Sequence, residues 1–210
     1  MEKGSREIHM NEISSLIYRI FEWITRFAYL QLLWILFSLI GGIILGIFPA
    51  TVAMFAIIRK WLRGNTEISL FPVFWSFYKN EFHKSNQVGL ILYLLIFIIG
   101  IDFIYLYENS GQLTWVQAPL FAFMLLSLLF VSYLFPAFVH FELNHFSIMK
   151  HAFFMMLVHP LHSLLMLLSL LSLAVIVYYI PAFGFIFGAS SSAFITMSLA
   201  LHAFNKLQKR

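Results

Sequence analysis

The residues best suited to chemistry are one glutamate and two histidines that follow a long apolar run. Glu142 and His145 are three positions apart and would share one face of a helix, and His151 follows less than two turns later. A metal ion needs three or four converging ligands in a defined geometry. One Glu-x-x-His pair without a second copy is weak support for such a site. We interpret these side chains as ordinary groups at helix ends, and a metal site at Glu142, His145 and His151 is the alternative.

Asp102 is the only acid well inside an apolar run. A carboxylate inside a membrane is costly, and it usually marks an ion, proton or ligand path. Asp102 lies within two helical turns of Glu108, however, and a carboxylate near the end of a span costs less than one at its centre. We therefore expect Asp102 to be solvated or hydrogen-bonded by a tyrosine, with an intramembrane polar site as the alternative.

The composition narrows the function classes, because 61% of the 210 residues are hydrophobic and 10% are charged. Soluble domains carry about 25% charged residues, so the sequence predicts an all-α integral membrane protein. The chain has no cysteine, which excludes a disulfide framework and a thiol nucleophile. Walker A, dinucleotide-binding and GxSxG motifs are also missing from the sequence. We predict that the protein is not an enzyme, needs no cofactor and binds no nucleic acid.

The apolar pattern predicts a bundle of about six membrane-spanning segments within a membrane domain at 27–204. These segments lie near 27–45, 47–62, 87–107, 115–141, 160–180 and 182–204. Residues 1–26 form the N-terminal region, and residues 205–210 form a short polar tail. Amphipathic patterns over 11–26 and 71–84 predict two helices in the membrane interface. For 11–26, an equally good interpretation is that the first span simply continues as a helix into water.

The first two segments are predicted to form a short, tight hairpin, because 27–62 is too long for one span and slightly short for two. Four residues mark its turn and close packing: Gly41, Gly42, Gly46 and Pro49. With this hairpin, all 13 Lys and Arg residues fall on one side of the membrane. The positive-inside rule makes that side cytoplasmic and places both termini there. The residues that return the hairpin to this side are the basic anchors Arg59, Lys60 and Arg63, and the turn is expected on the outer side.

Small residues recur every four positions in the last predicted span, at Gly184, Gly188 and Ser192. Such a face lets two membrane helices approach closely. We expect it to serve packing, either within the chain or against a partner.

Several stretches resemble the YesL-type bacterial membrane proteins, a family of unknown molecular function. The resemblance is carried by LLWILFSL (32–39), GIFPATVA (46–53), IIRKWLRG (57–64), FWSFYKNEF (74–82), YLFPAFVHFE (133–142) and KHAFFMMLVHPLHSLL (150–165). It implies a small multi-span protein of the bacterial cell membrane, often encoded beside carbohydrate-uptake and glycan-degrading genes. It implies no catalytic residues.

The function predicted from these features is an auxiliary membrane subunit of an ABC-type carbohydrate importer. Its partners would be membrane lipids and either a transporter permease or a second copy of the chain. One alternative is a small transporter or channel that acts alone, in which Asp102 would matter. The other is a membrane metalloenzyme built on the Glu142 and His145 region.

Overall fold

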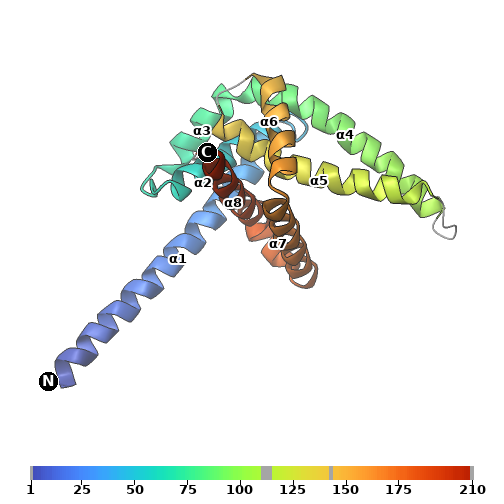
Figure 1. The fold of residues 1–210 in the computed structure, drawn as a ribbon. Helices are drawn as coiled ribbons and strands as arrows, with labels where there is room; N and C mark the ends of the chain where they lie inside the picture. Colours follow the sequence, from blue (N-terminus) through green and yellow to red (C-terminus); the bar gives the residue numbers. More distant parts are fainter. Residues whose placement is uncertain (1, 110–114, 142–143, 209–210) are drawn as a thin grey trace.

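The computed structural model describes the backbone of residues 2–109, 115–141 and 144–208, with side chains for 15–109, 115–141, 144 and 146–206. All regular structure in these residues is helical, and Figure 1 shows how the helices are arranged. The helices are α1 (Glu2–Ile40), α2 (Ile47–Leu62), α3 (Leu70–Asn80), α4 (Phe82–Glu108), α5 (Gln117–His140), α6 (His145–Val158), α7 (Pro160–Tyr179) and α8 (Pro181–Gln208).

Five of these helices are long and apolar enough to cross a membrane. They are Ser15–Ile40 of α1, Phe82–Glu108, Gln117–His140, Pro160–Tyr179 and Pro181–Lys206, as judged from length and composition within the described residues. The predicted class of all-α membrane protein is therefore confirmed. The predicted second segment, which is α2, is not among the five.

Helix α1 is one continuous helix and has no break where the sequence suggested a change from interfacial helix to span. No glycine or proline lies between Ser5 and Ile40 that could interrupt it. Residues 11–26 and the first predicted span are therefore parts of one helix. The first span was predicted to end near residue 45, whereas the helix ends at Ile40.

Helix α2 is short and buried, and the other helices of the body assemble around it. Its 16 residues correspond to a length of about 24 Å, which is less than the roughly 30 Å of a hydrocarbon core. Eleven of the 16 are buried. It packs against α1, α3, α4, α5 and α8. The second predicted segment is therefore an internal helix of the body and faces other helices along most of its length.

Helix α3 carries the aromatic stripe predicted over 71–84, but it is shorter than that range. It ends at Asn80, and α4 starts two residues later, so α4 begins five residues before the predicted span. Phe74 and Tyr78 are buried against α1 and α2, whereas Phe71 and Trp75 are exposed. All four rings lie 5.0–6.0 Å from the ring of Phe37 on α1.

The remaining helices either belong to the packed region around α2, as α6 does, or extend away from it. The short helix α6, for which no separate element was predicted, packs along the C-terminal end of α5 and shares a buried cluster with α2, α4 and α8. Figure 1 shows α1 and the α4–α5 pair extending from the body in different directions, with the α7–α8 pair extending in a third. The spans therefore splay outward from a common body around α2.

Candidate functional site

The turn between α1 and α2 is built around two glycines with different tasks. Gly42 has φ +71° and ends α1 in a Schellman arrangement, in which the Ile43 N–H donates to Ser38 and the Gly42 N–H donates to Leu39. Ile43 follows with φ +63°, a left-handed conformation that is unusual for a β-branched residue. The turn thus depends on one glycine for its shape and holds one isoleucine under strain.

Gly41 and Gly46 let the two ends of the turn touch. A Cβ on Gly41 would collide with the Cα of Gly46 and lie 2.6 Å from the Tyr78 hydroxyl. A Cβ on Gly46 would collide with the Ser38 carbonyl oxygen and lie 2.8 Å from that of Phe37. The obstacles at Gly46 are backbone atoms, which cannot rotate away. Pro49 is buried in the first turn of α2, where a missing N–H is tolerated.

Side chains from α3 and α4 supply hydrogen bonds to backbone carbonyls at this turn. Tyr78 donates to the Phe37 oxygen at 3.1 Å, and burial raises the pKa of its phenol, which keeps the proton in place. Asn86 donates to the Leu45 oxygen at 3.0 Å, and Tyr93 donates to the Ile44 oxygen at 2.6 Å. We call these three residues the capping residues. They bind the turn to α3 and to the first half of α4.

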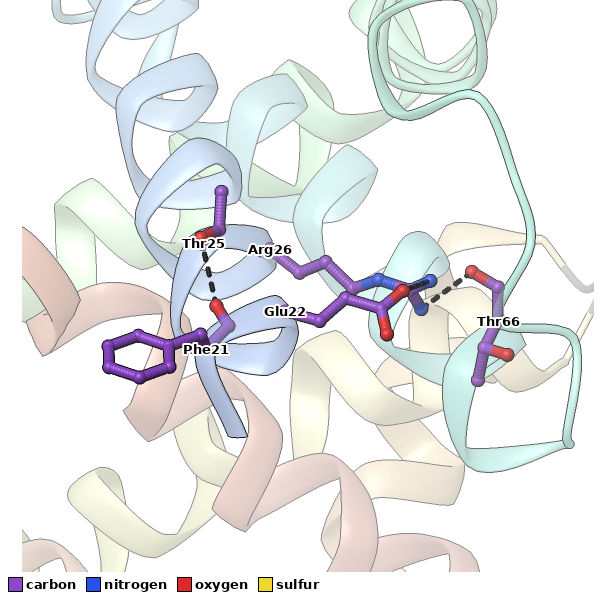
Figure 2. Close-up of polar contacts among 5 residues, drawn as sticks. All are labelled: Phe21, Glu22, Thr25, Arg26 and Thr66. Carbon is purple, nitrogen blue, oxygen red and sulfur yellow. Dashed lines mark hydrogen bonds and ion pairs between the residues drawn. The ribbon is translucent and has the colours of Figure 1, made fainter. Parts of the chain in front are cut away.

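The opposite end of the hairpin is fastened by Arg26. Figure 2 shows its guanidinium group between the Glu22 carboxylate and the Thr66 carbonyl, with the bond to Thr66 at 2.8 Å. Thr25 donates to the Phe21 carbonyl of its own helix at 2.8 Å and makes no such link. Arg26 therefore joins α1 to the loop that follows α2.

The predicted basic anchors lie close to this fastening. Arg59 donates to the Val139 carbonyl at the end of α5. The Lys60 ammonium lies 5.3 Å from the centre of the Phe77 ring, and the Lys84 ammonium lies 5.1 Å from that of Phe138. Arg63 caps the C-terminal end of α2. The ends of α2 and α5 and the start of α4 thus meet at one basic end of the body.

Of the predicted metal-site residues, only His151 can be placed in full. Glu142 and the side chain of His145 lie outside the described residues. The Nδ1 atom of His151 is 2.7 Å from the Ser147 carbonyl oxygen on its own helix, and its ring packs against Phe141. Among the side chains that the structure describes, no group of three His, Cys, Asp or Glu residues converges.

Asp102 is half-buried on α4, six residues before the helix ends. Its spacing from Ile99 and from the buried Leu106 places it on the side of α4 that faces α5.

The predicted small-residue face on α8 is only partly used for packing within the chain. A Cβ on Gly184 would lie 2.6 Å from a Val177 methyl on α7, so this glycine serves the α7–α8 contact. A Cβ on Gly188 would meet nothing within 4 Å. Ser192 is half-buried and donates to the Ala189 carbonyl at 2.9 Å. Gly188 thus lies beside open space on a membrane helix.

An apolar cleft of about 670 Å³ lies between the start of α2 and the α4–α5 pair. Its lining includes Phe48 from α2, Ile96 from α4 and Leu128 from α5, and the Thr51 and Ser127 hydroxyls are its main polar groups. Two further apolar clefts of about 530 and 520 Å³ lie between α1 and α8. Surfaces of this kind suit hydrocarbon or apolar side chains rather than hydrated ions.

Sequence reasoning missed the polar contacts that hold the hairpin in place. The Gln31 side-chain oxygen accepts the Ser190 N–H at 2.9 Å and joins α1 to α8, and both residues are buried. The Trp34 indole donates to the Thr51 hydroxyl at 3.0 Å. The available signal was an isolated polar group within an apolar run, such as Gln31 or Tyr93. Such a residue indicates that its side chain has a hydrogen-bond partner in the folded protein, but the sequence does not show which residue that partner is.

A model of the family described as "Protein of unknown function, DUF624" matches residues 27–103, the stretch that contains the hairpin and its capping residues. "Uncharacterized protein YteU" of Bacillus subtilis (strain 168) is 34% identical, over 91% of this chain and 86% of that protein. "Uncharacterized protein YesL" of the same organism is 32% identical, over 90% and 89%. "Uncharacterized protein YesV" is 30% identical, over 93% and 95%. No solved structure matches the chain.

Proposed function

Because the chain belongs to the DUF624 family, a family of unknown function that includes YesL-type proteins, we propose that it is a non-enzymatic accessory subunit of a membrane transport complex. In this role it packs laterally against a transporter permease. The expectation that the transporter is an ABC-type carbohydrate importer rests on the family resemblance.

The observation that carries the proposal is that α7, and the faces of α4 and α8 around Gly100 and Gly188, bury little within the chain. Only Ser163 and Met166 of α7 are buried, and both lie in its first two turns. On α4, Gly100 is exposed, and a Cβ there would meet nothing within 4 Å. Gly188 on α8 has the same open surroundings. Glycines of this kind allow a helix from another protein to approach closely, so the splayed spans offer faces for a partner.

The basic end gives the proposed orientation. Arg59 and Lys84 lie near the ends of α2 and α4 and contact the end of α5, and Arg26 contacts the loop that follows α2. By the positive-inside rule this end faces the cytoplasm, with both termini on that side. The partner would then be contacted within the membrane of a bacterial cell, with the basic end in position to contact anionic lipid.

The test is purification from native membranes in mild detergent, with identification of the proteins that copurify. A transporter permease should be recovered with the wild-type chain, and recovery should fall at least about tenfold with Gly188→Leu or Gly100→Leu, a loss of roughly 1.4 kcal/mol or more. A Cβ added at either glycine meets nothing within 4 Å, so both variants should stay folded and monodisperse. Gly184→Leu is the contrasting variant, because it strikes Val177 and should weaken the chain itself. Reproducible isolation as a lone homo-oligomer would contradict the proposal.

A second candidate function, a transporter that acts alone, is favoured by the position of Asp102. This carboxylate lies on the α5-facing side of α4, beyond the Ile99 side chain that lines the 670 Å³ cleft. Flux through liposomes that contain only this protein, lost in Asp102→Asn and kept in Glu108→Gln, would support it. Equal flux in liposomes with and without the protein would reject it.

A further inference from the structure

The turn of the α1–α2 hairpin lies at the basic end of α4 rather than at its far end. Asn86 and Tyr93 hold the Leu45 and Ile44 carbonyls, and a Cβ on Gly89 would strike the Phe48 ring. These contacts place the turn beside roughly the first 6–17 Å of a helix that is about 40 Å long. The start of α4 is itself at the basic end, since Lys84 lies over Phe138.

The hydrogen bonds made at both ends of α2 fall within the half of the α4–α5 pair that is nearer the basic end. Leu45, just before α2, contacts Asn86, and Arg59, near the other end of α2, contacts Val139 at the end of α5. The end of α4 and the start of α5 lie at the other end of these spans, far from α2 in Figure 1. A hairpin that crossed the membrane would instead bring its turn to the level of those two helix ends.

The tip of the turn is apolar and uncovered. Ile43, Ile44 and Leu45 are 58%, 63% and 54% exposed. Irregular backbone is tolerated within a membrane only where its polar groups find partners in the protein. The capping residues supply such partners to the Phe37, Ile44 and Leu45 carbonyls. The turn therefore combines an apolar exterior with carbonyls at its tip that accept hydrogen bonds from the protein, which favours contact with hydrocarbon.

We propose that α1 and α2 form a re-entrant hairpin that enters and leaves on the basic side, with Ile43–Leu45 in contact with the lipid acyl chains of that leaflet. This replaces the expectation of a turn on the outer side. Four helices, α4, α5, α7 and α8, then cross the membrane, and both termini still share the basic side. The inference is independent of the accessory role, because it concerns the position of the hairpin and not its partner.

Cysteine accessibility tests the position of the turn, because the chain has no cysteine of its own. The test variant is Ile44→Cys, with Trp115→Cys beside the α4–α5 loop and Glu67→Cys in the loop after α2 as controls for the two aqueous sides. A membrane-impermeant maleimide should label Trp115→Cys in intact cells and Glu67→Cys only after permeabilisation. Ile44→Cys should react only after solubilisation in detergent. Labelling of Ile44→Cys at the rate of either control would overturn the proposal.

Depth measurement with a nitroxide label tests whether the turn reaches the acyl chains. Leu90→Cys, on an exposed part of α4 between Asn86 and Tyr93, is the reference within the membrane, and Glu67→Cys in the loop after α2 is the aqueous reference. The ratio of oxygen to nickel-chelate collision rates rises with distance from the nearer membrane surface, and for a label at Ile44 it should match that at Leu90. A ratio at Ile44 equal to that at Glu67 would place the turn in water and contradict the re-entrant hairpin.

Discussion

The hairpin formed by α1 and α2 and the pair formed by α4 and α5 are neighbouring two-helix units, yet they are stabilised in different ways. The hairpin has a buried second helix, a close glycine contact and side chains that bind its turn. The outer halves of α4 and α5 bury little, and large side chains such as Phe97 and Phe121 are exposed. A helix long enough to span the bilayer can end in water on either side, whereas a short helix must have its ends satisfied by protein. Stability should therefore be concentrated in the hairpin.

The largest expected effect is at Gly46. Gly46→Ala should destabilise the folded protein by about 3 kcal/mol, because the added methyl group meets backbone oxygens that cannot move aside. Thermal unfolding in detergent, followed by circular dichroism, measures the change. Gly188→Ala is the matched control, because its methyl group enters open space and should leave the midpoint unchanged or slightly raised. Equal losses in the two variants would remove the distinction between the hairpin and the outer spans.

The next largest effect is expected from removing the side-chain hydrogen bonds to the turn. Asn86→Ala should destabilise the protein by about 1–3 kcal/mol, because the Leu45 oxygen loses its side-chain donor. Tyr78→Phe should cost about 1 kcal/mol, because the Phe37 oxygen keeps the Gly41 N–H as a donor. Unfolding midpoints in detergent measure this loss. Tyr178→Phe at the exposed end of α7 and Asn80→Ala on the surface of α3 are the controls, and both should be close to neutral. A neutral result for both test variants would show that the turn is solvated, against the re-entrant position.

The residues in these two predictions differ in how well their roles could be predicted from the sequence. Helix α2 has the bounds expected for the second segment, because glycine and proline interrupt the apolar run at its start, which is a local signal. The resemblance to YesL-type proteins was confirmed as well. The capping residues were not predicted, because Asn86 and Tyr93 lie more than 40 positions from their acceptors. The pairing of Gln31 with Ser190, 159 positions apart, is a still longer tertiary contact.

The depth of the hairpin was also beyond the sequence, for a physical reason. Counting Lys and Arg residues gives the same side for both ends of the hairpin whether its turn crosses the membrane or stops inside it. Length alone favoured a crossing, since α1 is long enough for one. The contacts of the turn with the first half of α4 are what support the re-entrant arrangement proposed above, and those contacts depend on packing.

A smaller effect of opposite sign is expected at Ile43. Ile43→Asn should stabilise the protein by about 1 kcal/mol, because asparagine adopts the positive φ of this position more readily than a β-branched residue does. Ile44→Asn is the control, since it removes the same kind of exposed side chain from a neighbour with an ordinary φ. If the turn touches acyl chains, the stabilisation by Ile43→Asn should be clear in detergent. It should be smaller in bilayers, because a polar side chain in contact with acyl chains costs free energy. Lower unfolding midpoints for Ile43→Asn in both media would show that losing the apolar side chain outweighs the relief of backbone strain.

The smallest expected effect is at the fastening of the other end of the hairpin. Glu22→Gln should cost only about 0.3–0.5 kcal/mol, because the pair with Arg26 is an i,i+4 contact at a partly exposed site. Arg26→Gln should cost more than Glu22→Gln, because it also removes the bond to the Thr66 carbonyl that joins α1 to the next loop. Unfolding midpoints at low and high salt separate the two, since only the ion pair is screened by salt. Salt should erase the effect of Glu22→Gln and leave most of that of Arg26→Gln. The link from α1 to the loop after α2, rather than the ion pair on α1, would then hold this end of the hairpin in place.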